Sequence, residues 1–405
     1  MRKYQLSYFY LNCAVLCVLT LQIPAFAESV AEPDSEKGLW EEFGYGKKGL
    51  QFESADGNNF LWFGVRLQTR YSNEKLYKND LPGNPVERQT ELAFNRGRLK
   101  LGGHLVSPRF TIYSEYDFVD NRLLDYRASY SFTDWLNIRV GQWKSPYNRE
   151  RIDSSGAQQF AERSVATPWF TVDRQQGVVA SGRFGKGRSY DSSYWFGWLS
   201  GSGRGGSASD GKGLWLGRYQ WNFTRRVLAF SQSDIALREK AAGSLSIALV
   251  DGKSKYTSFS SGGGGQLPGF EDAPEQDYDL QQAMLESAWK KGGFSWQQEL
   301  HWKRVRGRSS GVEQDILGGY VQAGMFFSQL WPAVPTPLEL ALRYAQVDPD
   351  RSVHGDYEKE LTMGANWFFN GHRNKLTADL SRVISRGTKD RDSNNRVRLQ
   401  WEWSF

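Results

Sequence analysis

Apolar and polar residues alternate along most of this chain in segments of about ten residues. In the segment 60–71, Leu61, Phe63 and Val65 fall on one face, while Arg66 and Gln68 fall on the other. A period of two is typical of a β-strand with one apolar face and one wet face. The segment 396–405 repeats this pattern, and together the two segments predict the first and last strands of a large sheet.

The same alternation, of varying clarity, predicts fourteen further strands and brings the expected total to about sixteen. These strands are expected at 94–105, 109–119, 123–132, 136–144, 177–185, 191–200, 213–223, 227–237, 278–290, 293–305, 316–328, 338–348, 358–370 and 375–386.

The connections between these strands alternate roughly between long and short. The long ones cover 73–93, 145–176, 201–212 and 238–277, and the short ones include 106–108, 133–135, 224–226 and 291–292. Outer-membrane barrels show this asymmetry, with tight periplasmic turns and longer outer loops, and an even strand number places both termini on the side of the turns. The alternative fold, a soluble β-sandwich, has no reason to segregate its long loops. The predicted fold class is therefore all-β, a transmembrane antiparallel β-barrel.

Composition agrees with many strands that each have one wet face. The chain has 405 residues, of which 39% are hydrophobic and 15% aromatic, with 42 glycines. No run of 18 apolar residues follows residue 27, which excludes a helical membrane protein. Aromatic side chains gather near strand ends, where rings are expected at the two membrane–water boundaries. Examples are Tyr126, Tyr130, Phe132, Tyr219, Trp221, Phe223, Trp401, Trp403 and Phe405.

The first residues predict the compartment. Arg2 and Lys3 precede a short apolar stretch, and small residues lead to Ala27, so residues 1–27 are expected to be a secretory signal peptide cleaved after Ala27. Residues 28–48 are expected to be an acidic periplasmic leader, and 49–405 the barrel domain. The chain ends in Trp-Ser-Phe after an alternating strand, so Phe405 is expected to be recognised by the barrel-assembly machinery of a Gram-negative outer membrane.

Residues able to support catalysis are scarce. Both cysteines, Cys13 and Cys17, lie in the predicted signal peptide, which leaves no thiol, disulfide or Cys-zinc site in the mature chain. A serine hydrolase needs a histidine beside its nucleophile, and no Gly-x-Ser-x-Gly elbow accompanies any histidine. The four histidines are His104, His301, His354 and His372. The sequence therefore predicts that the protein is not an enzyme and needs no cofactor or metal.

Two loop motifs give only weak evidence for a function. The string at 201–206 matches Gly-x-Gly-x-x-Gly, but no helix can follow it before the strand at Leu214, so it predicts a flexible outer loop. The carboxylates between Glu271 and Asp279 are expected to be solvated rather than to bind calcium. A formal net charge of +6 is too small to indicate a nucleic-acid partner.

A barrel of sixteen strands is too wide for side chains to fill, so its lumen holds water and its lining decides what passes. The polar positions of the first, second and last strands place seven basic side chains on three adjacent strands. These are Arg66, Arg70, Arg96, Arg98, Lys100, Arg396 and Arg398. The next two strands contribute Glu115, Asp117, Asp125 and Arg127. This arrangement predicts a basic wall that draws anions in; the alternative is that the charges are solvated and set only a weak preference.

The connection 145–176 is the third on the outer side and is too long for a simple turn. Its charges nearly balance, and Phe160, Pro168, Trp169 and Phe170 give it an apolar cluster. The basic residues Arg149, Arg151 and Arg163 are the candidate constriction residues. We expect this loop to fold inward and narrow the pore, because an external cap would gain little from its apolar cluster.

Three stretches of the first third resemble the phosphate- and polyphosphate-selective porin family of Gram-negative outer membranes. The first is 49–57 running into Phe-Gly-Val-Arg-Leu-Gln at 63–68. The second is Arg-Gly-Arg-Leu-Lys-Leu-Gly-Gly at 96–103, followed by Tyr-Ser-Glu-Tyr-Asp-Phe at 113–118. The third is Arg-Val-Gly-Gln-Trp-Lys-Ser-Pro-Tyr at 139–147, followed by Glu-Arg-Ser at 162–164.

The resemblance implies a sixteen-strand homotrimeric barrel whose third loop folds into the pore, and an arginine ladder that leads to a lysine-rich anion site. Arg66, Arg96, Arg98 and Lys144 occupy the matching motif positions. The inward loop is almost charge-balanced and shows no lysine cluster, so the expected function is passive diffusion of small hydrophilic solutes with a general preference for anions such as phosphate. The alternative is a channel for sugars or other neutral solutes, for which Trp62, Trp143 and Trp195 would form an inward aromatic slide.

Overall fold

The computed structural model describes residues 42–46, 48–77, 85–208, 213–270, 278–387 and 391–405. The predicted signal peptide and most of the predicted leader lie outside these ranges. No helix among the described residues has the length and hydropathy needed to cross a bilayer.

Strands account for most of the described chain. In order they are β1 (Glu42–Gly46), β2 (Gly49–Glu53), β3 (Phe60–Tyr77), β4 (Pro85–Leu105), β5 (Ser107–Asp117), β6 (Arg122–Thr133), β7 (Leu136–Lys144), β8 (Arg174–Phe184), β9 (Ser192–Leu199), β10 (Leu214–Trp221), β11 (Ala242–Ser254), β12 (Ser258–Ser260), β13 (Gly263–Gly265), β14 (Tyr278–Lys291), β15 (Phe294–Gly307), β16 (Glu313–Met325), β17 (Leu338–Asp348), β18 (Tyr357–Asn370), β19 (Asn374–Arg386) and β20 (Arg391–Ser404).

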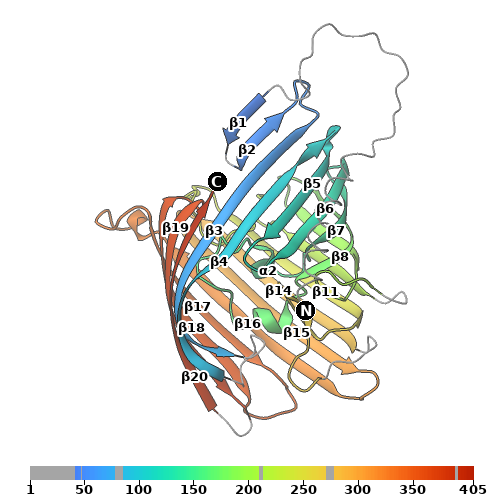
Figure 1. The fold of residues 1–405 in the computed structure, drawn as a ribbon, viewed down its shortest axis with the longest axis vertical. Coiled ribbons are helices and arrows are strands. Elements are labelled where there is room, and N and C mark those ends of the chain that lie inside the picture. The colour runs from blue at the N-terminus through green and yellow to red at the C-terminus, as the bar shows by residue number, and fades with distance from the viewer. Residues whose placement is uncertain (1–41, 47, 78–84, 209–212, 271–277, 388–390) are drawn as a thin grey trace, which may run out of the picture. The chain divides into compact units, whose positions relative to one another are not determined.

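Sixteen of these strands, β3 to β11 and β14 to β20, pair antiparallel with their neighbours and close into a barrel. The closing pair is β20 with β3, in a register that runs from Val397 opposite Asn73 to Ser404 opposite Arg66. The hairpin β1–β2 extends the sheet by pairing with the start of β3 (Figure 1). The predicted all-β barrel of about sixteen strands is confirmed.

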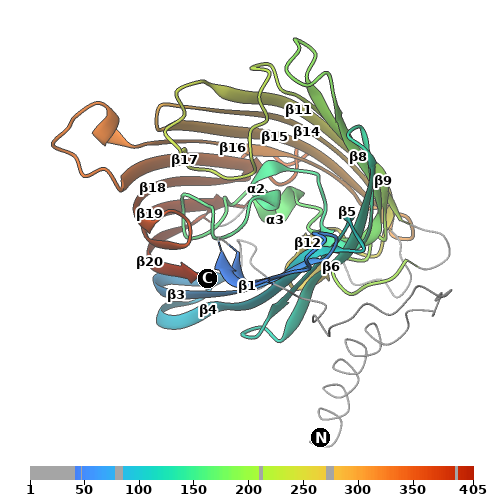
Figure 2. The same cartoon turned by 90° about the horizontal axis from the view of Figure 1, so that it is seen from above.

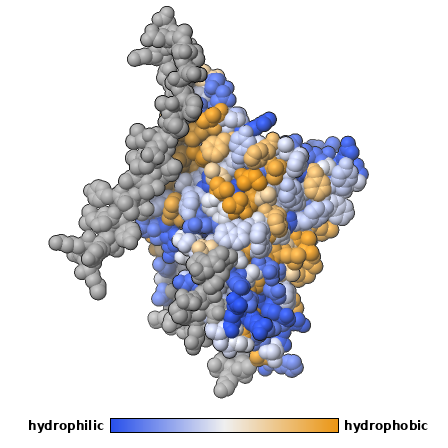
Figure 3. Space-filling model, turned by 90° about the vertical axis from the view of Figure 1, so that its right-hand side faces the viewer, coloured by the Kyte–Doolittle hydropathy of each residue, from blue (hydrophilic) through white to orange (hydrophobic). Residues whose placement is uncertain are grey.

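The two faces of the strands differ as the alternation predicts. In β11, Leu245, Ile247 and Leu249 are exposed on the outside, while Ser246 and Ala248 are buried inside. Figure 3 shows hydrophobic side chains gathered over the upper and middle part of one face, with hydrophilic ones toward its lower end. This apolar belt is the surface that a transmembrane barrel presents to lipid.

One expected strand is wrong. Residues 227–237 form no strand; they belong to the connection 222–241 between β10 and β11, and β11 itself lies in the stretch expected to be a long loop. Leu228, Gln232 and Asp234 of this connection are buried, whereas Val227 and Leu237 are exposed. The buried residues pack against other protein segments, so the alternation here does not separate lipid from water. The connection 326–337, with the 3₁₀ helix η2 (Phe327–Gln329), is a second long segment on the side where short turns were expected.

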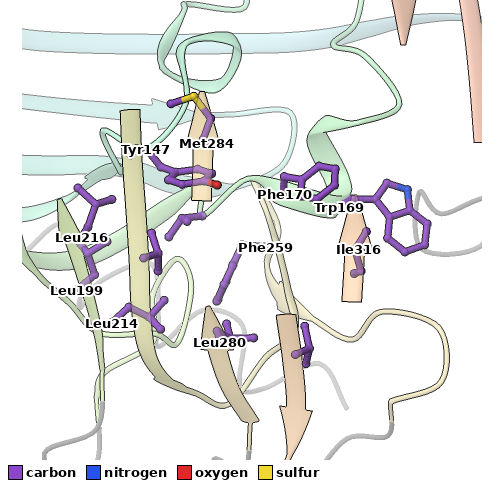
Figure 4. Close-up of a cluster of buried hydrophobic side chains, with 14 of the residues drawn as sticks. Tyr147, Trp169, Phe170, Leu199, Leu214, Leu216, Phe259, Leu280, Met284 and Ile316 are labelled. Atoms are coloured by element: carbon purple, nitrogen blue, oxygen red, sulfur yellow. The ribbon is translucent and has the colours of Figure 1, made fainter. Parts of the chain in front are cut away.

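The connection 145–173 carries two short helices, α2 (Arg149–Ile152) and α3 (Thr167–Phe170), which lie inside the ring of strands (Figure 2). Its Tyr147, Trp169 and Phe170 join an apolar cluster with inward residues of the surrounding strands (Figure 4). Those strand residues include Leu199, Leu214, Leu216, Leu280, Met284 and Ile316. Fully burying each such side chain contributes roughly 1.5–3 kcal/mol, so the loop is held by a core of its own inside the barrel.

Candidate functional site: the lumen and its constriction

The structure places the seven basic residues of the predicted wall on β3, β4 and β20, where most of them meet carboxylates. Arg66 is 2% exposed and pairs with Glu402 of β20; its Nη1 also donates to Ser155 Oγ of the inward loop at 2.9 Å. Arg98 pairs with Glu115 and with Asp117 of β5, each at 2.7 Å. The charges of Arg66 and Arg98 are therefore largely balanced by neighbouring strands.

In the outer part of the basic wall, more than one basic side chain shares the same carboxylate. Arg396 lies 3.5 Å from Glu74, and Arg398 pairs with the same carboxylate. Lys100 stands opposite Glu115 in the ladder, although Glu115 already pairs with Arg98. Seven basic side chains thus meet five carboxylates: Glu74, Glu115, Asp117, Glu162 and Glu402. The sequence places Glu402 on the polar face of the last strand, but a role was predicted neither for it nor for Glu74; their even spacing with the inward arginines was the signal that could have shown it.

Glu162 connects the inward loop to the basic wall. Its carboxylate lies 3.1 Å from Arg70 Nη2 and 3.4 Å from Arg96 Nη2, and the same Arg70 nitrogen donates to the carbonyl of Ala161 at 2.6 Å. Burial by itself raises the pKa of Glu162, but the nearby guanidinium groups of Arg96, Arg70 and Arg163 lower it well below its usual value. One permanent negative charge is therefore shared by two arginines at the constriction.

The opposite wall, β14 to β19, holds the inward loop with carboxylates. Glu299 accepts hydrogen bonds from the backbone nitrogen of Glu150 at 2.7 Å and from Asn148 Nδ2 at 3.0 Å. Further strand carboxylates receive loop donors in the same way: Glu286 from Arg149, Glu339 from Gln159, Glu358 from Trp169, Glu360 from Val165 and Asp379 from Ala161. These acidic groups bind the inward loop, so the loop separates them from the open part of the lumen.

Two of the predicted constriction arginines belong to this anchoring. Arg149 is fully buried and pairs with Glu286 at 2.9 Å, and Glu286 also binds Arg218 at 2.8 Å. Arg151 pairs with Asp173 at 2.5 Å. Arg149 and Arg151 therefore form ion pairs that hold the loop in place, and they do not line the pore.

Lys144 and Arg163 have a different environment. Both donate to the carbonyl oxygen of Asp153, Lys144 Nζ at 3.0 Å and Arg163 Nη2 at 2.9 Å, and Arg163 Nε donates to the carbonyl of Glu150. Burial and the adjacent Arg151 lower the pKa of Arg163 to about 9, which still leaves it charged at pH 7. Among the described residues, neither side chain forms an ion pair with a carboxylate. Lys303 and Lys375 of the opposite wall also donate to loop carbonyls and form no ion pair among the described residues. Lys144 and Arg163 are therefore two of several basic groups around the loop that lack a carboxylate partner.

The other candidate residues are placed as follows. Trp143 is 2% exposed within the apolar cluster and Trp195 packs against it, so of the three inward tryptophans only Trp62 remains open to the lumen. His301 is buried, stacks on Phe170 at 4.9 Å and contacts Glu299 at 3.0 Å, which makes it part of the loop support. Within the described ranges, no cluster of three His, Cys, Asp or Glu side chains could hold a metal ion.

Comparisons with known proteins agree with this geometry. The family model described as "Phosphate-selective porin O and P" matches residues 63–223 and 270–405. A curated protein of Aquifex aeolicus is 26% identical over 125 residues, which is 25% of this chain and 30% of that protein's length.

Solved structures with the same fold include three outer-membrane proteins. The anion-selective porin from Comamonas acidovorans has 12% identity and a TM-score of 0.53, covering 85% of this chain and 99% of that one. The channel DcaP of Acinetobacter baumannii has 11% identity and a TM-score of 0.56, covering 87% and 99%. OmpT of Vibrio cholerae has 9% identity and a TM-score of 0.56, covering 86% and 98%. Because the family model covers most of the chain, this protein belongs to the phosphate-selective porin O and P family, a family of outer-membrane channels.

Proposed function

We propose that this protein is an outer-membrane porin that passes small hydrophilic solutes passively and favours anions. The observation that carries the proposal is the surplus of basic side chains where the inward loop meets β3, β4 and the end of β7. Among the described residues, Lys144 and Arg163 form no ion pair with a carboxylate, while Arg70 and Arg96 share Glu162. The acidic side chains of the opposite wall are held by backbone and side-chain donors of the loop.

The proposed preference for anions arises from the charges that lie close to the narrow point of the pore. Cations at a narrow point replace part of an anion's hydration and repel other cations. Fixed charges of one sign on low-dielectric walls also focus the field and raise the local concentration of counter-ions. The arginines that pair with carboxylates add little to this field, so Lys144 and Arg163 are proposed to set the preference, with Arg96, Arg70 and Lys100 supporting them. The name of the Comamonas acidovorans relative, an anion-selective porin, is consistent with this reading.

The decisive measurement is the reversal potential of the purified protein in a planar bilayer under a potassium chloride gradient. We expect an anion-selective sign, and we expect the variants Lys144→Gln and Arg163→Gln to shift the potential toward neutrality. Arg304→Gln is the matched control, because Arg304 sits in an exposed pair with Asp315. Cation preference of the unchanged protein would overturn the proposal.

Three further features remain proposals of the same kind. A signal peptide ending at Ala27, recognition of Phe405 by the barrel-assembly machinery and a homotrimeric state are all expected from the sequence and its family resemblance. Mass spectrometry of the mature N-terminus and the oligomeric mass of the detergent-solubilised protein test the first and the third. Deletion of Phe405, followed by assay of the amount of barrel in the outer membrane, tests the second.

A further inference from the structure

A cavity of about 350 Å³ lies against the inner surface of β3 to β7, near the barrel end at which β3 begins. Its walls combine aromatic rings with basic groups, among them Phe60, Trp62, Tyr113, Lys48, Arg127 and Arg139. None of these residues contributes to the ion pairs of the constriction. The cavity is therefore a separate feature of the lumen on the periplasmic side of the inward loop.

The aromatic part of the cavity is built around Trp62. Its indole lies against Gly102 on the neighbouring strand, where a Cβ atom would come within 2.6 Å of the ring. A Cβ atom at Gly64 would make only an ordinary contact with the ring, at 3.5 Å, and would instead meet the carbonyl oxygen of Lys48 at 2.6 Å. The Tyr113 ring stands 6.0 Å from Trp62 between centroids, with an interplanar angle of 44°. Gly102 thus lets a large ring lie against the barrel wall beside a second ring.

The cations of the cavity stand beside these rings. Arg127 lies 4.7 Å from the centroid of Tyr113, and Lys48 Nζ lies 5.3 Å from that of Trp62. Arg139 donates to Ser129 Oγ at 3.1 Å. The nearest acidic neighbour along β6, Asp125, is already paired with Arg174 at 2.6 Å. Within the described ranges, these three cations form no ion pair with a carboxylate, in contrast to Arg66 and Arg98.

We propose that this cavity binds aromatic carboxylates. A ring can stack on Trp62 or against the edge of Tyr113, which favours planar aromatic groups over saturated ones. The carboxylate of the same ligand can then take two hydrogen bonds from a guanidinium such as that of Arg127. A small inorganic anion would use the cations but could not stack on the rings. The inference rests on the proposed passage of anions through the lumen and adds a substrate class to it.

The test uses the full-length porin in planar bilayers, with benzoate, cyclohexanecarboxylate and acetate added separately to each side of the membrane. Benzoate is expected to reduce the small-ion current at concentrations about tenfold lower than cyclohexanecarboxylate, because only benzoate can stack. Addition from the periplasmic side is expected to be the more effective. If benzoate and acetate reduced the current equally, the cavity would act on anions only through its charge, and the proposal would be overturned.

Variants assign the effect to the cavity. Trp62→Leu and Arg127→Gln should each raise the half-blocking concentration of benzoate about tenfold. Arg70→Gln is the control within the constriction; it should weaken anion selectivity and leave the benzoate effect unchanged. An unchanged benzoate effect in both Trp62→Leu and Arg127→Gln would refute the site.

The comparison of the three acids needs no variant, so the proposal stays testable if a variant fails to fold. The reversal potential, measured in the same membranes, separates the two proposals. An anion-selective channel that ignores benzoate contradicts this inference alone, whereas a cation-selective channel contradicts the proposed function.

Discussion

Arg66 and Glu402 form a buried ion pair across the seam at which β20 closes the barrel against β3. Arg66 Nη2 lies 3.0 Å from Glu402 Oε2, and the two side chains are only 2% and 1% exposed. Gln68 donates to the same carboxylate at 2.6 Å. An arginine that the family resemblance assigns to an anion pathway is therefore largely neutralised by a carboxylate from the other end of the chain.

This pair predicts that two substitutions cancel. Arg66→Gln should lower anion selectivity, because it leaves the negative charge of Glu402 without its main partner. The double variant Arg66→Gln, Glu402→Gln should return selectivity close to that of the unchanged protein, since it removes one charge of each sign. Reversal potentials of the four proteins measure the coupling directly. If the double variant is no closer to the unchanged protein than Arg66→Gln, the two charges act on ions independently.

Glu162 predicts a change in the opposite direction. It is the carboxylate shared by Arg70 and Arg96, so Glu162→Gln leaves two cations at the constriction without that charge. A unit charge about 4 Å from an ion in water is worth about 1 kcal/mol, so the anion-to-cation permeability ratio should rise by up to about fivefold.

Asp120→Asn is a suitable control, because Asp120 is an exposed loop carboxylate that pairs with Arg122. A permeability ratio that rises as much in this control would show that any acidic residue of the outer surface has the same effect.

Asp153 predicts a pH-dependent stability. Burial raises the pKa of its carboxyl to about 7, although Arg149 and Lys290 act to lower it, and neither carboxyl oxygen has a hydrogen-bond partner among the described residues. An unfolded chain loses this proton near pH 4, whereas the folded protein keeps it until pH 7. The unfolded state therefore binds fewer protons between these values, and stability should fall as the pH rises from about 4 to 7.

Asp153→Asn should remove that slope. The temperature at which the barrel denatures, followed by gel mobility after heating, should rise in the variant at pH 8 and change little at about pH 3, where both states of the unchanged protein are largely protonated. Asp56→Asn is the contrasting control. The pKa of Asp56 is lowered to about 2, chiefly by a hydrogen bond from Ser54, so its substitution should have the same effect at pH 5 and pH 8.

Much of this molecule is predictable from the alternation of its residues. The barrel, the closure of the last strand on the first and the inward position of Arg66, Arg96 and Arg98 all follow from a period of two, because lipid and water impose opposite requirements on the two faces. The inward loop was predictable from Trp169 and Phe170, which would have no reason to stay in water.

The rest depends on contacts between distant segments. Alternation assigns a face to Glu74 or Glu402 but does not say which arginine each one meets across the ladder. It also fails at 227–237, where Leu228 is buried by protein rather than by lipid. Alternation also fails for Leu214 and Leu216. These apolar side chains point into the barrel, because the inward loop supplies the apolar surface against which they pack.

The connection 222–241 reaches the inward loop from the opposite end of the barrel. The backbone nitrogen of Gln232 donates to the carbonyl of Ala157 at 3.1 Å, and Gln159 donates its backbone nitrogen to Gln232 Oε1 at 2.7 Å. A backbone hydrogen bond between two residues brings their Cα atoms near the separation that a disulfide spans. Ala157→Cys with Gln232→Cys should therefore cross-link on oxidation, with no competing thiol once the predicted signal peptide, which holds both natural cysteines, is removed.

The cross-link should change the mobility of the denatured protein on a gel and reverse with reductant. It should also suppress fluctuations of the single-channel current that arise from movement of one segment against the other. Ala157→Cys paired with Arg225→Cys is the control, because Arg225 lies at the start of the same connection, where it bonds to Asn222. Efficient cross-linking of the control pair, or none in the first pair, would show that the connection does not hold the position it has here.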